Sequence, residues 1–132
     1  MRILVTGGAG FVGSNFVEFA IHERGYDVVT LDALTYAGSP GNLNSIVDHP
    51  RHRFVRGDIG DADLVRNIVP AVDAIINFAA ETHVDRSIED CKTFIETNVG
   101  GTQTLLDAAL DAGVDRFLQV STDEVYGQIH EG

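Results

Sequence analysis

The stretch STDEVYG, residues 121–127, places two carboxylates side by side, Asp123 and Glu124, directly after an apolar run. One interpretation is helix capping, because Ser121 and Glu124 have the Ser-x-x-Glu spacing of a capping box. The other is acid and base chemistry on a bound substrate, since two adjacent carboxylates in a desolvated pocket cannot both ionise cheaply. Consecutive strand residues point to opposite faces, so the second interpretation requires the strand to end at about Thr122.

A second candidate site is the string TGGAGFVG, residues 6–13, which lies between a strand-like run and a helical pattern. It fits Gly-x-Gly-x-x-Gly through Gly8, Gly10 and Gly13, and Gly-x-x-Gly-x-x-Gly through Gly7, Gly10 and Gly13. Such a turn lets a pyrophosphate approach the backbone, where the helix N-terminus offers free N–H groups. The structural alternative is that these glycines serve only turn geometry and helix packing.

Acidic residues close the next two strand-like runs. Asp32 lies where a carboxylate would accept hydrogen bonds from an adenosine ribose. This favours NAD over NADP, because Asp32 would repel a 2′-phosphate and the following residues ALTYAG offer no arginine or lysine. Asp58 and Ile59 are expected to bracket the adenine, by hydrogen bonding and by packing respectively. The alternative for Asp58 is capping of the next turn.

These residues must be positioned by strands and helices that alternate along the chain. The nearly continuous apolar runs predict strands buried on both faces. The pattern predicts an α/β fold, a Rossmann-type doubly wound parallel sheet of strand order 3-2-1-4-5, in one domain over residues 1–132. The expected strands are residues 2–7, 27–32, 53–58, 74–80 and 117–122.

Three helices are expected between the strands. The first, 10–24, should bury a stripe formed by Val12, Phe16, Phe19 and Ala20 and end at Gly25. The second begins near Asp61 as its N-cap and stops before Pro70, and the third runs over 90–112 with Gly113 as its stop signal. The turn-rich stretch YAGSPGNLNS predicts a loop with one short helix.

The charge and the cysteine content of the chain disfavour some classes of binding partner and indicate a cellular setting. A formal net charge of -11 over 132 residues makes nucleic acid and anionic membrane surfaces poor partners. A single cysteine, Cys91, a first apolar run too short for a secretory signal and the lack of a membrane-length apolar run predict a reducing, cytoplasmic setting. Cys91 has no metal-ligand spacing around it, so we expect an inert thiol and no metal site.

Five strings carry a family resemblance: TGGAGFVGSN, LDALTYAG, NFAAETHVDRSI, FIETNVGGT and STDEVYG, in this order. The chain resembles the extended short-chain dehydrogenase/reductase family, and within it the dTDP-glucose 4,6-dehydratases, over essentially its whole length. The glycine motif is common to the superfamily, whereas TYAG, HVDRSI and STDEVYG are typical of nucleotide-sugar dehydratases. The resemblance implies NAD as cofactor, dTDP-glucose or UDP-glucose as substrate, and a homodimer formed through helices that include 90–112.

The resemblance also assigns roles. It places Thr82 and Thr122 beside the sugar and counts Thr122 among the catalytic residues. Asp123 becomes the proton donor and Glu124 the proton acceptor in loss of water across sugar carbons 5 and 6. Hydride would pass from carbon 4 to NAD and return at carbon 6. Contacts with NAD are implied for Gly7, Gly8, Gly10, Phe11, Val12, Gly13, Asp32, Ala33, Leu34, Thr35, Asp58, Ile59, Phe78, Ala79, Ala80 and Thr97.

The sequence departs from the family in one respect. The family's Tyr-x-x-x-Lys pair is absent from these 132 residues, since His130 stands four residues after Tyr126. We expect roughly the first two-fifths of such an enzyme, without the later strands and the C-terminal substrate region, and a chain that is inactive alone. The strand at 117–122 would then be an open apolar sheet edge. Two rivals remain: a catalytically silent NAD-binding module, and a nucleotide-sugar 4-epimerase, which has no need of the Asp123–Glu124 pair.

Other polar residues near these motifs carry less weight. His83, Asp85 and Arg86 follow the fourth strand near the expected crevice, where turn capping or ion pairing is the favoured interpretation. Asn98 is expected to bond main chain rather than substrate.

Overall fold

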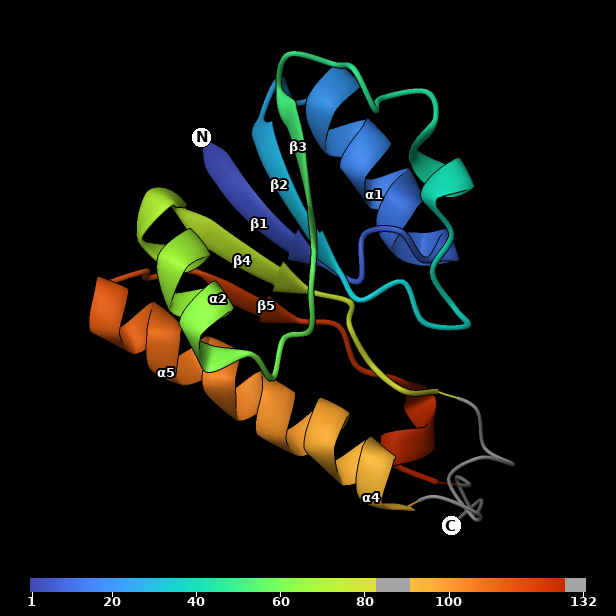
Figure 1. The fold of residues 1–132 in the computed structure, drawn as a ribbon, viewed down its shortest axis with the longest axis vertical. Coiled ribbons are helices and arrows are strands. Elements are labelled where there is room, and N and C mark those ends of the chain that lie inside the picture. Colours follow the sequence, from blue (N-terminus) through green and yellow to red (C-terminus); the bar gives the residue numbers. More distant parts are fainter. Residues whose placement is uncertain (83–90, 128–132) are drawn as a thin grey trace, which may run out of the picture.

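A computed structural model describes residues 1–82 and 91–127 of the chain. Five parallel strands form one sheet of order β3-β2-β1-β4-β5, which confirms the predicted topology (Figure 1). The strands are β1 (Arg2–Thr6), β2 (Asp27–Asp32), β3 (His52–Arg56), β4 (Ala74–Asn77) and β5 (Phe117–Gln119). The helices are α1 (Phe11–His22), η1 (Pro40–Leu43), α2 (Ala62–Ile68), η2 (Val69–Ala71), α4 (Cys91–Phe94), η3 (Ile95–Gly101), α5 (Thr102–Ala112) and η4 (Asp123–Val125).

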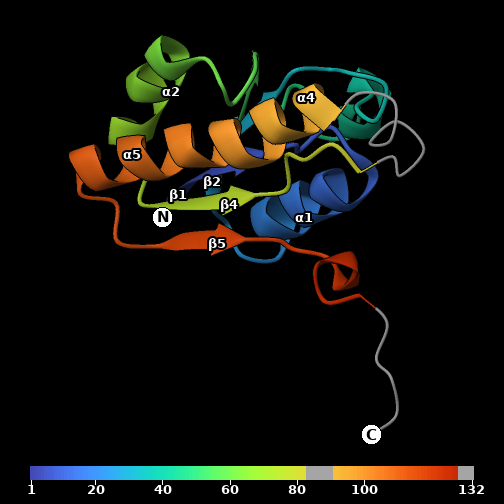
Figure 2. The ribbon, with the colours of Figure 1, turned by 90° about the horizontal axis from the view of Figure 1, so that it is seen from below.

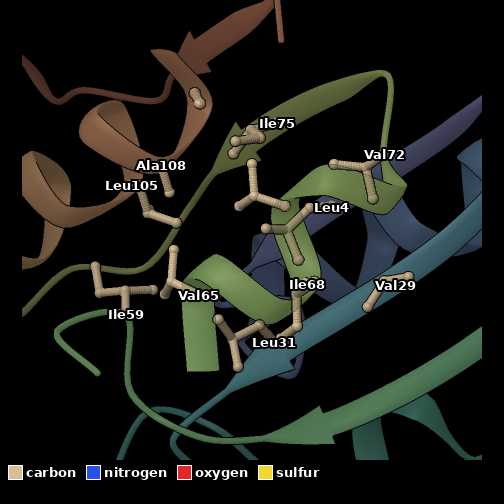
Figure 3. Packing of buried hydrophobic residues seen from close by; sticks show 12 residues of the cluster. Leu4, Val29, Leu31, Ile59, Val65, Ile68, Val72, Ile75, Leu105 and Ala108 are labelled. Carbon is tan, nitrogen blue, oxygen red and sulfur yellow. The ribbon is translucent and has the colours of Figure 1, made fainter. Parts of the chain in front are cut away.

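Helices cover both faces of the sheet, with α2 and α5 on one side and α1 on the other (Figure 2). The register pairs Leu4 with Val29 and Ile75, so these side chains share a face and pack against α2 and α5 (Figure 3). The neighbouring residues Ile3 and Val28 point to the opposite face and pack against α1. Burial on both faces explains why the strand sequences are nearly continuous in apolar residues.

The predicted buried stripe of α1 is confirmed for Ala20, which is buried, and for Phe16, which packs against the same cluster, but it was wrong for Val12 and Phe19. Val17, Ala20 and Ile21 face the sheet, whereas Val12 is 60% and Phe19 is 49% exposed. The helix is turned by about one residue, or about 100°, from the predicted stripe. The cause is local, because Gly13 packs so closely on the turn before α1 that a Cβ there would lie 2.3 Å from the carbonyl oxygen of Gly7.

The predicted helix boundaries are confirmed at two points. The Asp61 side chain accepts a hydrogen bond from the Leu64 N–H at 3.1 Å and caps α2, which ends at Ile68 before Pro70. Gly113 ends α5 in the left-handed conformation, with φ of +71°. The short helix expected in the turn-rich stretch is η1.

The long helical segment after residue 90 is not uniformly α-helical. Between α4 and α5, the seven residues of η3 form a π-helix, which the sequence pattern did not predict. The strands β1, β3, β4 and β5 also end before the predicted boundaries, so the chain leaves the sheet early and enters the loops at its carboxyl edge. Within residues 1–82 and 91–127, no helix is long and apolar enough to cross a lipid bilayer.

Candidate functional site

A cavity of about 470 Å³ lies at the carboxyl ends of the strands, and segments that follow all five strands line it. This is the position at which parallel α/β sheets bind ligands. Most of the predicted site residues meet here: Gly7, Gly10, Phe11, Val12, Gly13, Asp32, Ala33, Thr35, Asp58, Ile59, Phe78, Ala79, Ala80, Thr82, Thr97 and Thr122.

Three predicted residues whose side chains the structure describes do not line the cavity: Gly8, Leu34 and Asp123. The sequence analysis also missed several lining residues, most of them small or apolar. The signal available for them was position, since each lies within a few residues of a strand end. The missed residues are Leu31, Ala37, Gly38, Gly57, Glu81, Val120 and Ser121.

The four glycines of the turn have different roles. A Cβ on Gly7 would lie 2.7 Å from the Ala79 nitrogen, and one on Gly8 would lie 2.6 Å from the Thr30 side chain. Gly13 is equally crowded, so packing alone requires glycine at these three positions. Gly10 differs, because its Cβ would have the Gly7 carbonyl oxygen as its nearest neighbour, at 3.2 Å. Gly10 lines the cavity. At this position, unlike at the other three, the missing side chain leaves space for a ligand rather than for neighbouring protein atoms.

The first turn of α1 faces this cavity through Phe11 and Val12, and Phe11 is 82% exposed. The N–H groups that begin a helix have no acceptor within it, and they carry the positive end of the helix dipole. Gly10, the N-cap residue, provides no side-chain capping bond. The donor set and the open space at Gly10 therefore fit a dinucleotide pyrophosphate, as the motif predicted.

Asp32 is 9% exposed and both of its carboxylate oxygens are hydrogen-bonded to the backbone. Oδ2 accepts from the Ala9 N–H and Oδ1 from the Leu34 N–H, each at 2.8 Å. Each oxygen can accept a further hydrogen bond, and Asp32 lines the cavity. The residue is therefore positioned for a hydroxyl ligand and is also a structural tie.

Leu34 is absent from the cavity lining for a backbone reason. It has φ of +54°, a left-handed conformation that is uncommon for a residue with a side chain. This turn directs its N–H to Asp32, while its side chain packs into the apolar cluster beneath α1. Leu34 shapes the site through Asp32 rather than by contact with the cavity.

Asp58 and Ile59 both line the cavity, but each is also used by the fold. Asp58 Oδ1 accepts from the Gly60 N–H at 2.7 Å and thereby stabilises the turn, which bears out the capping alternative. Ile59 is 4% exposed and packs so closely on Gly101 that a Cβ on that glycine would lie 2.5 Å from its side chain.

Thr97 of the π-helix η3 lines the cavity. The next residue, Asn98, forms hydrogen bonds with the loop after β4. The Asn98 Oδ1 accepts from the Glu81 N–H at 2.8 Å, and its Nδ2 donates to the Glu81 carbonyl at 3.0 Å. This confirms the main-chain role expected of Asn98. The amide pair fixes the peptide that precedes Thr82, a lining residue. Functional sites often contain such π-helical turns.

A buried amide, Asn77, supports the same edge of the sheet and was missed by the sequence analysis. Its Nδ2 donates to Gln119 Oε1 at 2.7 Å, and its Oδ1 accepts from the Thr6 hydroxyl and from the Ala79 N–H. Asn77 is fully buried, so these bonds link the ends of β1, β4 and β5 in a low-dielectric setting. The available signal was a polar residue inside the apolar run AIINFAA.

Asp123 begins η4, the one-turn helix that follows Thr122. The strand has therefore ended before the two carboxylates, as their joint use requires. Thr122 is the N-cap residue and makes no side-chain capping bond, so the capping box predicted from Ser121 is not the arrangement found. Asp123 is exposed, and the desolvated pocket expected around it is not formed by the described residues; the Glu124 side chain lies outside them.

The remaining candidates lie outside the described residues or do not line the cavity. His83, Asp85 and Arg86 lie outside the described residues. Tyr126 is 85% exposed and Cys91 is an exposed free thiol. In the part of the chain that the structure describes, no three His, Cys, Asp or Glu residues are grouped so that they could hold a metal ion.

Comparison with known proteins agrees with the motifs. The family model for GDP-mannose 4,6 dehydratase matches residues 4–132. The Low-salt glycan biosynthesis protein Agl12 of Haloferax volcanii is 65% identical over 132 residues, which are all of this chain and 43% of that protein. The structure of DesIV, a dTDP-glucose 4,6-dehydratase from Streptomyces venezuelae with NAD and TYD bound, is 55% identical with a TM-score of 0.93, covering 100% of this chain and 42% of that one.

A UDP-glucose 4-epimerase from Thermotoga maritima, solved with UDP-glucose, is more distant in sequence, at 32% identity and a TM-score of 0.88 over 100% of this chain and 41% of that one. The chain thus spans about two-fifths of the length of these relatives. The comparisons confirm the predicted resemblance to nucleotide-sugar dehydratases. Because the family model covers nearly every residue, the chain belongs to the GDP-mannose 4,6 dehydratase family.

Proposed function

We propose that this chain is the NAD-binding part of a nucleotide-sugar 4,6-dehydratase that converts dTDP-glucose to dTDP-4-keto-6-deoxyglucose. The observation that carries the proposal is the cavity at the carboxyl ends of the strands, which the first turn of α1, Gly10 and Asp32 all line. A helix N-terminus with a glycine turn suits a pyrophosphate, and a carboxylate at the end of β2 suits a ribose. The dehydratase DesIV, solved with NAD and TYD, supports this choice.

Each group of residues has a role in the proposal. Phe11 and Val12 offer backbone N–H groups to the pyrophosphate, and Asp32 accepts from the adenosine ribose and disfavours a 2′-phosphate, which selects NAD. Ile59 packs on the adenine beside Asp58. The remaining predicted lining residues, from Phe78 to Ala80 and Thr97, contact the same cofactor, and Thr82 contacts the sugar.

A bound NAD would supply the hydride acceptor for sugar carbon 4 and the hydride donor for carbon 6. Glu124 removes the proton on carbon 5, which the new carbon 4 ketone makes acidic, and returns a proton to carbon 5 when hydride reaches carbon 6. Asp123 protonates the carbon 6 hydroxyl, which leaves as water, and Thr122 contacts the sugar. The described residues leave Asp123 exposed, so we place the cover that desolvates it in the part of the relatives' length that this chain does not span. We place the Tyr-x-x-x-Lys pair in that part of the relatives as well. The 132 residues alone therefore bind NAD but do not catalyse the reaction.

The test is turnover by the full-length protein with dTDP-glucose and NAD, followed by mass spectrometry. The proposal expects a product lighter than the substrate by one water, and UDP-glucose serves as the matched alternative substrate. A product of unchanged mass would support a 4-epimerase instead. NAD binding without any product would support the silent NAD-binding module. The identity of 55% with a dehydratase against 32% with an epimerase favours the first outcome.

We also propose that residues 1–132 act as one NAD-binding unit and that the protein is a homodimer. The support for the dimer is a stripe of exposed apolar residues along η3 and α5: Ile95, Val99, Leu106 and Leu110. Surfaces of this kind usually mark interfaces. Light scattering should give twice the chain mass for the full-length protein and a monomer for the Leu110→Glu variant, in which a charge replaces a side chain that is 80% exposed.

A further inference from the structure

Ala9 lies at the centre of the glycine-rich turn, and both of its polar backbone groups are taken up by the protein. Its N–H donates to Asp32, as described above. Its carbonyl oxygen accepts two hydrogen bonds, from the Ser39 N–H at 3.0 Å and from the Asn42 Nδ2 at 2.8 Å. Ala9 is fully buried and does not line the cavity. The segment after β2 therefore holds the turn at a residue that does not itself line the cavity.

That segment, residues 38–46, is itself anchored. Leu43 is 3% exposed and Ile46 is fully buried, and both belong to the apolar cluster that contains Ala9. The Ser45 hydroxyl donates to the Glu18 carboxylate on α1. The Ser39 Oγ accepts from the Gly41 N–H and caps η1. The segment is thus a fixed support, joined to α1 by the Ser45–Glu18 hydrogen bond and by the shared apolar cluster.

The same segment also borders the ligand space. Ala37 and Gly38, which precede η1, line the cavity. A Cβ on Gly38 would lie 2.8 Å from Asp32 Oδ1, so the chain passes directly over this carboxylate. The carbonyl oxygen of Ala37 would be 3.9 Å from a Cβ on Gly10. The wall of the cavity and the support of the turn are therefore one continuous piece of chain.

We propose that residues 38–46 form a clamp that retains the bound dinucleotide, with Asn42 as its positioning residue. The proposal rests on the NAD site proposed above. The Asn42 amide fixes the carbonyl of Ala9, and with it the peptide that leads through Gly10 to the N–H groups of Phe11 and Val12. Donors held in place before binding cost less ordering when the ligand arrives. Loss of the amide leaves the core anchors Leu43 and Ile46 in place but lets the turn move, so the cofactor dissociates faster.

The experiment compares Asn42→Ala and Asn42→Asp with the matched control Asn44→Ala in the full-length protein. Asn44 is the C-cap residue of η1 and is exposed, and its side chain is not among the partners of Ala9. We expect NAD to dissociate about fivefold faster from Asn42→Ala, the value of one net hydrogen bond, with the control unchanged. Asn42→Asp should have a larger effect, because its carboxylate faces a carbonyl oxygen and cannot donate. The cofactor-free melting temperature of Asn42→Ala should be slightly lower than that of wild type, because the same bond is made without cofactor, so NAD dissociation is measured well below both melting temperatures.

A second readout does not depend on NAD. Hydrogen exchange of the amides of residues 9–13 in the cofactor-free protein should be faster in Asn42→Ala than in Asn44→Ala. Unchanged exchange and unchanged NAD dissociation would overturn the clamp, as would equally fast NAD dissociation from Asn42→Ala and Asn44→Ala. If the wild type does not bind NAD at all, the proposed function fails and the clamp has no dinucleotide to retain. A response in exchange alone would then still show that Asn42 positions the turn.

Discussion

The Asp32 carboxylate and the Ala9 backbone N–H form a buried hydrogen bond of 2.8 Å between residues that are 23 positions apart. This bond joins the end of β2 to the turn after β1. The second oxygen of the same carboxylate holds the Leu34 N–H, which keeps that residue in its left-handed conformation. A residue whose position suggests a ribose ligand is therefore also the tie between the two strand ends that form the site.

Replacing Asp32 by asparagine tests this double role. The amide is isosteric, but one of its two polar atoms is a donor, so one of the two backbone N–H groups loses its acceptor. We expect the free energy of unfolding to fall by about 2 kcal/mol, the value of a hydrogen bond to a charged group, and NAD affinity to fall with it. Urea unfolding and calorimetry measure the two effects. The control is Asp48→Asn at an exposed position, and equal stability of the two variants would contradict the structural tie.

Gly10 and Gly13 provide a matched pair. In Gly13→Ala the new methyl would lie 2.3 Å from the Gly7 carbonyl oxygen, so we expect a loss of about 3 kcal/mol or more in folding stability. In Gly10→Ala the nearest atom is 3.2 Å away and the methyl enters the cavity, so we expect a near-normal fold with at least about tenfold weaker NAD binding. Circular dichroism melting and calorimetry separate the two. Normal NAD binding by Gly10→Ala would mean that the pyrophosphate does not pass over this residue.

Much of this could be predicted from the sequence, because the alternation of apolar runs and helical patterns indicates a doubly wound parallel sheet and locates each strand end to within three residues. The cavity gathers the turn, Asp32, Asp58, the residues after β4 and Thr122 at one sheet edge, as parallel topology requires. The hydrophobic periodicity of the sequence did not predict the rotation of α1 about its own axis. The close approach of Gly13 to Gly7 sets that rotation, and this is a tertiary contact rather than a pattern.

The side-chain hydrogen-bond networks could not be predicted from the sequence either. Asn98 on the π-helix and Asn77 at the end of β4 act by bonding specific backbone groups, and no spacing rule predicts which ones. Asp58 satisfies both interpretations, since it caps a turn and lines the cavity. A single residue can meet a local and a global requirement at once, so choosing between the two from sequence alone was not possible.

His52 on the edge strand β3 makes stability depend on pH. Its Nε2 lies 3.0 Å from the Thr30 hydroxyl, and burial lowers the pKa of the ring below its ordinary value of 6.5; the charge of His49 lowers it further, although the Ile46 carbonyl opposes the shift. The unfolded chain then binds a proton that the folded chain resists. This contribution is complete above about pH 6.5 and is lost as the pH falls through that value towards the lower folded pKa.

Urea unfolding between pH 8 and pH 5, with those limits chosen at about 1.5 units on either side of the ordinary histidine pKa, measures this effect. His52→Gln removes the titrating ring but keeps a polar group near Thr30, so its stability should fall less steeply than that of wild type. His22→Gln, which removes a histidine from the last turn of α1, is the control. Parallel pH curves for wild type and His52→Gln would exclude His52 as the source.

The acidic surface makes stability depend on salt. The chain carries 20 acidic and 9 basic residues other than histidine, a net charge of -11. Among the described residues there is one ion pair, Lys92–Glu96, at 3.6 Å between exposed side chains of one helical segment. Self-repulsion of this size destabilises the compact state, and neighbouring cations offset little of it. We therefore expect the free energy of unfolding to increase with sodium chloride concentration.

The increase should follow screening, because the Debye length falls from about 10 Å at 0.1 M to about 3 Å at 1 M salt. Sodium chloride and potassium chloride at equal ionic strength should act alike, whereas sucrose serves as an uncharged control that strengthens burial without screening. A stability that does not change with either chloride would mean that the acidic side chains are spaced widely enough for repulsion to be negligible. A response to sucrose and not to the chlorides would assign the effect to burial rather than to charge.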